Sequence, residues 1–423
     1  MELFPILSLV ITAAAVLSWL NHKVFRLPTT IGVMVLSLLG SIAIMAVDQQ
    51  GYFDFRTPAA EAMETLDLQH TLLDWMLAFL LFAGALHVNL GHLSRERWVI
   101  GALATVGVVT STFMVGGLMY FACQQLGMEI RFLHCLLFGS LISPTDPIAV
   151  LGILKKAGAP KSLETQIAGE SLFNDGIGVV VFTVLLTMAG GTHPGAVEAP
   201  MDFNAIAIFL GQEVGGSVLL GLAGGLLAYA LLKTVDNYQV EILITLALAM
   251  GLYSLAMELH SSGPLAVVIA GLFIGNTGRA LAMSETTVER VDTFWELVDE
   301  IFNVILFVLI GMEVLLLQFP KDFLIAGVLA IPLVLLPRWI NVLTASKLLR
   351  RFGTFQKGTV AIMTWGGLRG GISVALALSI SPGVPARDLI LTMTYVVVVF
   401  SIVVQGLSVG PVIRTLLPKD SRA

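Results

Sequence analysis

Apolar stretches of about twenty residues follow one another along nearly the whole chain, and short polar segments separate them. A helix of about twenty apolar residues is long enough to cross the hydrocarbon core of a bilayer. Hydrophobic residues make up 57% of the 423 residues and charged residues only 12%, unlike the composition of soluble domains. The sequence therefore predicts an all-α polytopic membrane protein.

We expect about thirteen transmembrane helices. Their approximate ranges are 4–20, 29–47, 71–89, 97–123, 132–154, 163–189, 204–232, 240–260, 263–276, 294–317, 322–348, 358–380 and 388–413. The connections are short, so residues 1–423 are expected to form one transmembrane unit. The N-terminus lacks the basic region and cleavage site of a signal peptide, so the first helix should remain in the protein.

Basic residues indicate the orientation. Of the 23 Lys and Arg residues, seventeen lie on one side of the predicted spans, four lie on the other, and Arg338 and Arg369 lie within spans. Cytoplasmic loops carry the excess of Lys and Arg. We therefore expect an outer N-terminus and a cytoplasmic C-terminus, with the acidic segment 48–70 outside. The net charge of -6 gives no indication of a nucleic-acid partner.

Cysteine and histidine usage predicts neither a cofactor nor a transition-metal site. Cys123 and Cys135 lie at the end of span four and the start of span five, where a disulfide is conceivable but two free thiols are favoured. The seven histidines are scattered without ligand spacing, which argues against zinc or haem.

Two predicted spans are interrupted. Span five contains Ser143-Pro144-Thr145-Asp146-Pro147, and span twelve contains a glycine-rich segment around Arg369. An odd number of spans permits an inverted repeat of spans 1–6 and 8–13, in which spans five and twelve correspond, and paired interruptions indicate a binding site. Discontinuous helices are therefore predicted, with breaks at Pro144, Pro147, Gly366, Gly367, Gly370 and Gly371. The alternative is a simple kink, with Asp146 capping the second half-helix.

Span six carries a polar stripe. Ser171 and Asp175 share one helix face, and Glu170 and Asn174 form the adjoining stripe. A charge within a bilayer costs about 2.5 kcal/mol or more, so such a residue usually has a function. Hard cations prefer several oxygen ligands. We therefore expect a monovalent cation or a proton to bind at Asp175, Ser171, Thr145 and Asp146, with Asn174 beside them; the alternative for Asp175 is a hydrogen-bonded structural role.

The remaining intramembrane charges are expected to be structural. Glu170 and Arg369 are the predicted ion pair between spans six and twelve, since neither charge should remain alone in the membrane. Glu258, Glu300 and Glu313 lie near predicted span ends, where a carboxylate can reach the interface.

At these motifs the chain resembles the cation:proton antiporter 1 family, the NhaP-like sodium/proton exchangers. The matching segments are residues 143–147, Gly169-Glu170-Ser171-Leu172-Phe173-Asn174-Asp175-Gly176, residues 262–272 and Trp365-Gly366-Gly367-Leu368-Arg369-Gly370-Gly371-Ile372-Ser373. One departure is Phe82-Ala83-Gly84 in span three, where many members carry Phe-Glu-Gly.

The resemblance implies a core bundle at about 97–189 and 322–413 that moves against a dimerisation part at about 4–89 and 204–317. It implies a homodimer in a bacterial or archaeal inner membrane that contributes to pH homeostasis and salt tolerance. It also implies exchange of Na+ or Li+ for H+ at Asp175, and the Asn-Asp form of the motif is associated with electroneutral exchange.

Three alternatives to Na+/H+ exchange remain. A K+/H+ antiporter of the same fold would have the same motifs. An intramembrane aspartyl protease would use Asp146 and Asp175, but such proteases carry Gly-x-Gly-Asp, which is absent before Asp175. A cation channel is disfavoured because no filter sequence is evident. We expect a transporter rather than an enzyme.

Overall fold

The computed structural model describes residues 3–48, 76–190, 208, 211–315, 320–351, 353, 355, 356 and 358–416. Most of these residues are helical, and the part described contains no β-strand apart from one isolated bridge. Nine helical stretches in it are long and apolar enough to span a bilayer. The all-α membrane architecture is therefore confirmed, whereas the number of thirteen crossings stays a prediction. Most of the predicted outer segment 48–70 lies outside the described residues.

The helices follow the order of the predicted spans. In the N-terminal half they are α1 (Leu3–Leu20), α2 (Thr29–Asp48), α5 (Leu77–Leu86), α6 (Leu90–Arg95), α7 (Arg97–Ala102), α8 (Val108–Gln125), α9 (Phe132–Ile142), α10 (Ile148–Lys156) and α11 (Lys161–Met188). In the C-terminal half they are α13 (Ser217–Leu232), α14 (Tyr238–Glu258), α15 (Gly263–Phe273), α16 (Arg279–Ala282), α17 (Glu285–Glu313), α18 (Lys321–Leu348), α19 (Thr359–Trp365), α20 (Gly371–Leu378), α21 (Arg387–Phe400) and α22 (Gly406–Leu416).

Polar residues at the connections determine where several helices begin. The side chain of Asn237 accepts hydrogen bonds from the backbone at the start of α14, and Ser262 and Ser284 do the same for α15 and α17. Such caps satisfy backbone donors that have no partner within the helix. They explain why α14 and α15 remain separate helices although their sequences nearly abut.

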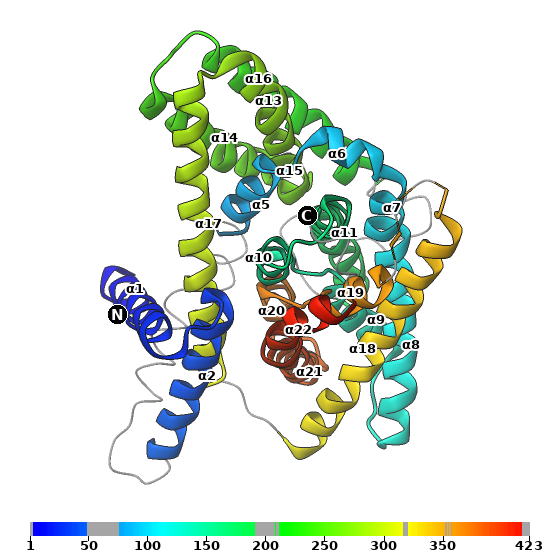
Figure 1. The fold of residues 1–423 in the computed structure, drawn as a ribbon. Helices are drawn as coiled ribbons and strands as arrows, with labels where there is room; N and C mark the ends of the chain where they lie inside the picture. Colours follow the sequence, from blue (N-terminus) through cyan, green and yellow to red (C-terminus); the bar gives the residue numbers. More distant parts are fainter. Residues whose placement is uncertain are drawn as a thin grey trace.

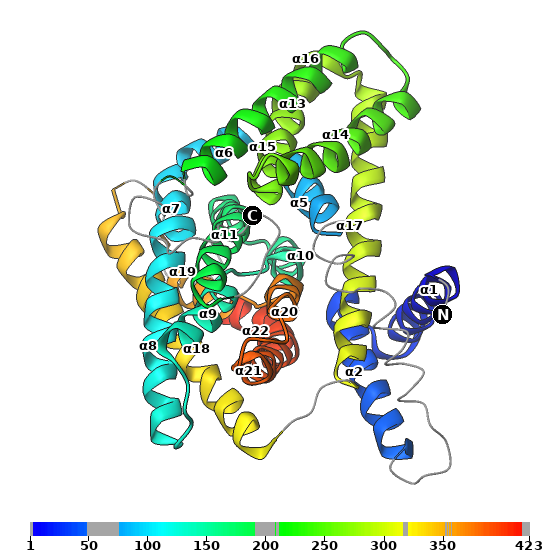
Figure 2. The same ribbon diagram turned by 180° about the vertical axis from the view of Figure 1, so that it is seen from behind.

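Figures 1 and 2 show the helices in two groups, with α13–α16 gathered at one end and α8 and α18 side by side at the other. One apolar cluster surrounds Trp295. Its buried members come from α5, α13, α14, α15, the short segment after α15, and α17. A second surrounds Ile362 and includes residues of α7, α10, α11, α18, α19 and α22. Each of these two clusters lies within one group, whereas the largest cluster joins helices of both.

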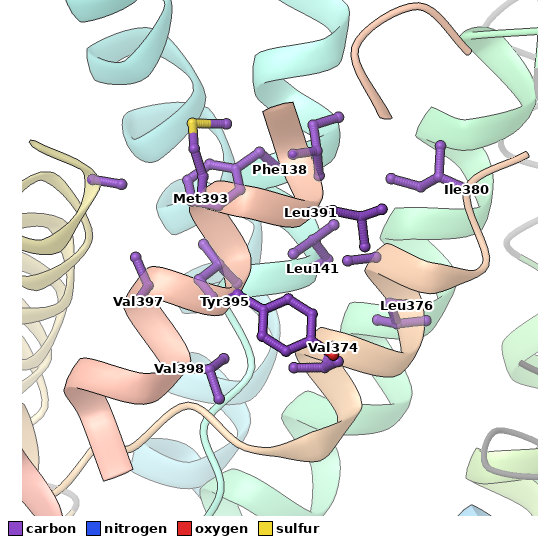
Figure 3. Packing of buried hydrophobic residues seen from close by; sticks show 14 of the residues in the cluster. Phe138, Leu141, Val374, Leu376, Ile380, Leu391, Met393, Tyr395, Val397 and Val398 are labelled. Carbon is purple, nitrogen blue, oxygen red and sulfur yellow. The ribbon is translucent and has the colours of Figure 1, made fainter. Parts of the chain in front are cut away.

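The largest apolar cluster includes the contact of α9, α20 and α21. Figure 3 shows Tyr395 of α21 with Leu141 of α9 and Val374 of α20 nearby. Lipid tails are as apolar as leucine, so close helix packing in a bilayer relies on small residues at the contacts. A Cβ atom on Gly139 of α9 would lie 2.4 Å from the carbonyl oxygen of Thr112 in α8. Glycine is thus what allows these two helices to touch.

The two cysteines lie on this same pair of helices. Cys123 and Cys135 are both buried and both free, so the prediction of two thiols is confirmed.

Candidate ion-binding site

Two broken helices cross at the site. One chain segment leaves α9 at Ile142 and enters α10 at Ile148, and the other leaves α19 at Trp365 and enters α20 at Gly371. The backbone N–H of Asp146 donates to the carbonyl of Leu368 at 2.8 Å, which joins the two segments in an antiparallel bridge. The predicted discontinuous helices are therefore confirmed.

Glycine makes the crossing possible. A Cβ atom on Gly370 would lie 2.0 Å from a carboxylate oxygen of Asp146, and one on Gly178 of α11 would lie 2.2 Å from the ring of Pro144. Contacts below 3.0 Å are not tolerated by real side chains without a shift. The break in the α9–α10 pair is therefore packed between α20 and α11.

The polar stripe of α11 contacts this break directly. The Asn174 amide donates from Nδ2 to Thr145 Oγ1 at 3.0 Å, and its Oδ1 accepts from the Thr145 backbone N–H at 3.4 Å. The Ser171 hydroxyl donates to the carbonyl of Thr145. All three side chains are buried. Asn174 therefore holds the unwound segment against α11, a role that the sequence had not indicated.

Asp175 lies one residue further along α11 and is only 7% exposed. In the part of the chain that the structure describes, its carboxylate accepts no hydrogen bond and forms no ion pair. Burial makes the charged form of Asp175 costly, and the negative charge of Asp146 adds to this cost by repulsion. A proton or a cation bound at Asp175 would relieve this repulsion.

Arg369 stabilises the end of α9. Its Nη1 atom donates to the carbonyls of Ser143 at 3.0 Å and Pro144 at 2.9 Å, and its backbone N–H donates to Ser401 Oγ at 2.9 Å. The last carbonyls of a helix lack partners and form the negative end of its dipole. The buried guanidinium satisfies these carbonyls where the helix stops.

The predicted ion pair between Glu170 and Arg369 is wrong. Glu170 pairs instead with Arg338 of α18, which donates from both terminal nitrogens to the two carboxylate oxygens, the second bond measuring 3.0 Å. Arg338 also donates to the carbonyl of Met363. Arg369 is committed to the carbonyls of the broken helix, so a different cation has to neutralise Glu170. Arg338 was visible in the sequence as the other basic residue within a predicted span.

The other acidic residues differ in their surroundings. Glu258 and Glu300 are exposed, as expected for residues that reach an interface. Glu313 is instead buried, and its Oε2 atom has no hydrogen-bond partner among the described residues. Ala83, the departure in span three, is buried in the cluster around Trp295.

Known proteins share this sequence and fold. A family model described as sodium/hydrogen exchanger, transmembrane, matches residues 10–415. The Na+/H+ antiporter NhaP of Pseudomonas aeruginosa is 48% identical over 410 residues, which cover 96% of this chain and 95% of that protein. The Na+/H+ antiporter NhaH of Halobacillus dabanensis is 34% identical over 353 residues, with 82% and 83% covered.

A solved structure has the same fold. The sodium proton antiporter MjNhaP1 from Methanocaldococcus jannaschii at pH 8 superposes with a TM-score of 0.75 and 18% sequence identity, and the match covers 99% of each chain.

Proposed function

The chain belongs to the sodium/hydrogen exchanger family, and on this basis we propose that it is a secondary antiporter that exchanges Na+ for H+ across the membrane. The observation that carries the proposal is Asp175, a buried carboxylate in α11 that lacks a protein partner among the described residues and faces the crossing of two broken helices. The relatives named Na+/H+ antiporters support this choice of ions.

We propose that one carboxylate serves both substrates. Na+ would bind to Asp175 with oxygens from Asp146, Thr145 and Ser171, because hard cations prefer carboxylate, carbonyl and hydroxyl ligands. Asn174 would hold Thr145 in place through its two hydrogen bonds. A proton would bind to the same carboxylate of Asp175. Na+ and H+ therefore exclude each other at this site.

Exclusion at one site also explains coupling. An occupied site has lost the charge of Asp175, whereas an empty site retains it within a medium of low dielectric constant. Moving the empty site across the membrane is therefore penalised by the cost of a buried charge. Only a site loaded with Na+ or H+ crosses readily, so influx of one ion drives efflux of the other.

The moving part is proposed to be the core bundle, about 97–189 and 322–413, and the static part the dimerisation part, about 4–89 and 204–317. Two apolar clusters support this division, since the cluster around Trp295 lies wholly in the static part and the cluster around Ile362 wholly in the core bundle. We further propose a homodimer through the static part, an outer N-terminus and a cytoplasmic C-terminus in the inner membrane.

The central experiment measures exchange by the purified protein in proteoliposomes that carry a pH-sensitive dye. Addition of Na+ should dissipate an imposed proton gradient, and Asp175→Asn should abolish this response while the protein still elutes as a folded species. The matched control is Asp388→Asn, because the side chain of Asp388 is 81% exposed at the start of α21. Exchange by Asp175→Asn at the wild-type rate would refute the proposed site.

The same vesicles identify the cation and the stoichiometry. Na+, Li+ and K+ are added separately, and a response to K+ that exceeds the response to Na+ would assign the chain to K+/H+ exchange instead. The measurement is then repeated with the membrane potential clamped at two values. Electroneutral exchange predicts equal rates at both potentials.

A further inference from the structure

One face of α17 points towards the site although it carries none of the proposed ion ligands. Asp299, Asn303 and Leu306 are spaced four and three residues apart, so they share a helix face. A Cβ atom on Gly371 would lie 2.3 Å from Leu306, and the adjacent Gly370 packs on Asp146. The face of α17 that carries Asp299 and Asn303 is therefore turned towards the start of α20, where Asp146 lies.

The two polar residues on this face are joined to each other. The Asn303 amide donates from Nδ2 to Asp299 Oδ1 at 3.1 Å and to the Asp299 carbonyl at 2.8 Å. Asn303 is 1% exposed, and its Oδ1 atom accepts no hydrogen bond from any described residue. A buried acceptor without a donor is costly, and such atoms are usually satisfied by water or an ion. The unpaired oxygen is thus an available ligand beside a carboxylate.

The charges around Asp299 are all negative. Asp299 is half-buried, and the carboxylates of Asp146 and of Glu300 and Glu296 on the same helix repel its charge. Among the described residues, no Lys or Arg forms an ion pair with Asp299. Two carboxylates and an amide oxygen, without a neutralising side chain on Asp299, are the type of surroundings that attract a hard cation.

We propose that Asp299 and Asn303 form an entry subsite that captures the monovalent cation before it reaches Asp146 and Asp175. The cation is bound there by the Asp299 carboxylate and Asn303 Oδ1, and it moves along the contact between α17 and α20 to the crossing of the broken helices. This proposal rests on the proposed antiport and specifies how its cation is collected. Asp299 is a capture residue, because exchange of Na+ for H+ still takes place at Asp175.

The test separates capture from chemistry through the kinetic constants of Na+-driven exchange in proteoliposomes. Asp299→Asn should raise the apparent KM for Na+ by about tenfold, the low end of the concentrating effect of a charged cleft, and leave the maximal rate within about twofold. Asn303→Leu, which keeps the branched shape but removes the amide group and its oxygen, should also raise the KM. The matched control is Glu289→Gln, an exposed carboxylate of α17 that is not among the charges acting on Asp299, and it should keep the wild-type KM.

Ionic strength and a charge-conserving variant complete the experiment. Asp299→Glu should have a KM close to that of wild type. Added choline chloride should reduce the difference in KM between wild type and Asp299→Asn, because salt screens the attraction between Asp299 and the cation. An unchanged KM in Asp299→Asn would overturn the entry subsite, and so would a loss of maximal rate alone. If Asp299→Asn does not fold, Asn303→Leu and Asp299→Glu decide by the same criterion. Failure of the antiport itself is recognised separately, because wild-type vesicles would then show no Na+ response.

Discussion

The buried pair of Glu170 and Arg338 allows a quantitative test of how α11 is tied to α18. The two side chains are 2% and 8% exposed, and the guanidinium binds the carboxylate through both terminal nitrogens. Removal of one partner from a buried pair costs about 3–5 kcal/mol, because the other charge is left in a low-dielectric interior. Coulomb's law gives a similar figure, about 4 kcal/mol at 4 Å with an effective dielectric constant of about 20.

We therefore expect Glu170→Gln and Arg338→Leu each to destabilise the protein by about 3–5 kcal/mol. The double variant should be far less destabilised than the sum of the two, since removal of both charges leaves neither of them stranded in the interior. The assay unfolds the detergent-solubilised protein by heat or denaturant and records the fraction that remains monodisperse. The four proteins form a double-mutant cycle, and its coupling energy measures the pair.

A second double-mutant cycle serves as the control, and it combines Glu170→Gln with Arg369→Leu in place of Arg338→Leu. Arg369 donates to the carbonyls of Ser143 and Pro144, so Arg369→Leu should destabilise the broken helix without strong coupling to Glu170→Gln. A larger coupling energy between Glu170 and Arg369 than between Glu170 and Arg338 would refute the pairing. Wild-type stability of Glu170→Gln would refute the assumption that the charge of Arg338 is stranded.

Three further changes test other parts of the site. Gly370→Ala should abolish exchange because its Cβ would lie 2.0 Å from Asp146, whereas Gly383→Ala, with open space around it, should exchange normally; proteoliposome rates compare the two. Tyr395→Phe should leave thermal stability unchanged or raise it by about 1 kcal/mol, since the buried hydroxyl in Figure 3 has no partner among the described residues; a clear loss of stability would contradict this. Competition at Asp175 predicts that the apparent KM for Na+ rises as pH falls, with a limiting increase of about tenfold per pH unit, because one proton competes with one cation. A KM independent of pH would exclude a shared site.

Local sequence signals predicted the helices and their breaks. Prolines and glycines act on the backbone of their own turn, so Pro144 and Pro147 indicated where α9 stops, and Gly370 indicated where α20 starts. Apolar length predicted the spans for the same reason, because it depends only on neighbouring residues.

Local sequence could not show which basic residue pairs with Glu170. Arg338 is 168 residues from Glu170, and only the packing of α18 against the core bundle brings them together. The sequence indicated that a buried carboxylate needs a cation, but it offered two candidates within spans. The role proposed for Asp299 could not be predicted for a related reason, since the sequence does not show which face of α17 is turned towards α20.

The charges at the crossing give a prediction for the stoichiometry of the proposed exchange and for the part of Asn174 in it. Glu170 and Arg338 cancel within their pair, and the remaining charges counted at the crossing are the guanidinium of Arg369 and the two carboxylates of Asp146 and Asp175. An empty site then carries one net negative charge, and one Na+ or one proton returns it to zero. The two loaded forms have equal charge, so one Na+ for one H+ should move no net charge.

Asn174→Asp would add a second negative charge at this point. The Thr145 hydroxyl, which now accepts from the Asn174 amide, can rotate and donate to a carboxylate, so the contact between α11 and the broken segment should survive. A site with two negative charges needs two protons to become neutral, while a single Na+ leaves one charge. The exchange rate of Asn174→Asp should therefore respond to an imposed membrane potential, unlike that of wild type. Equal sensitivity of the two proteins would contradict this account of charge at the crossing.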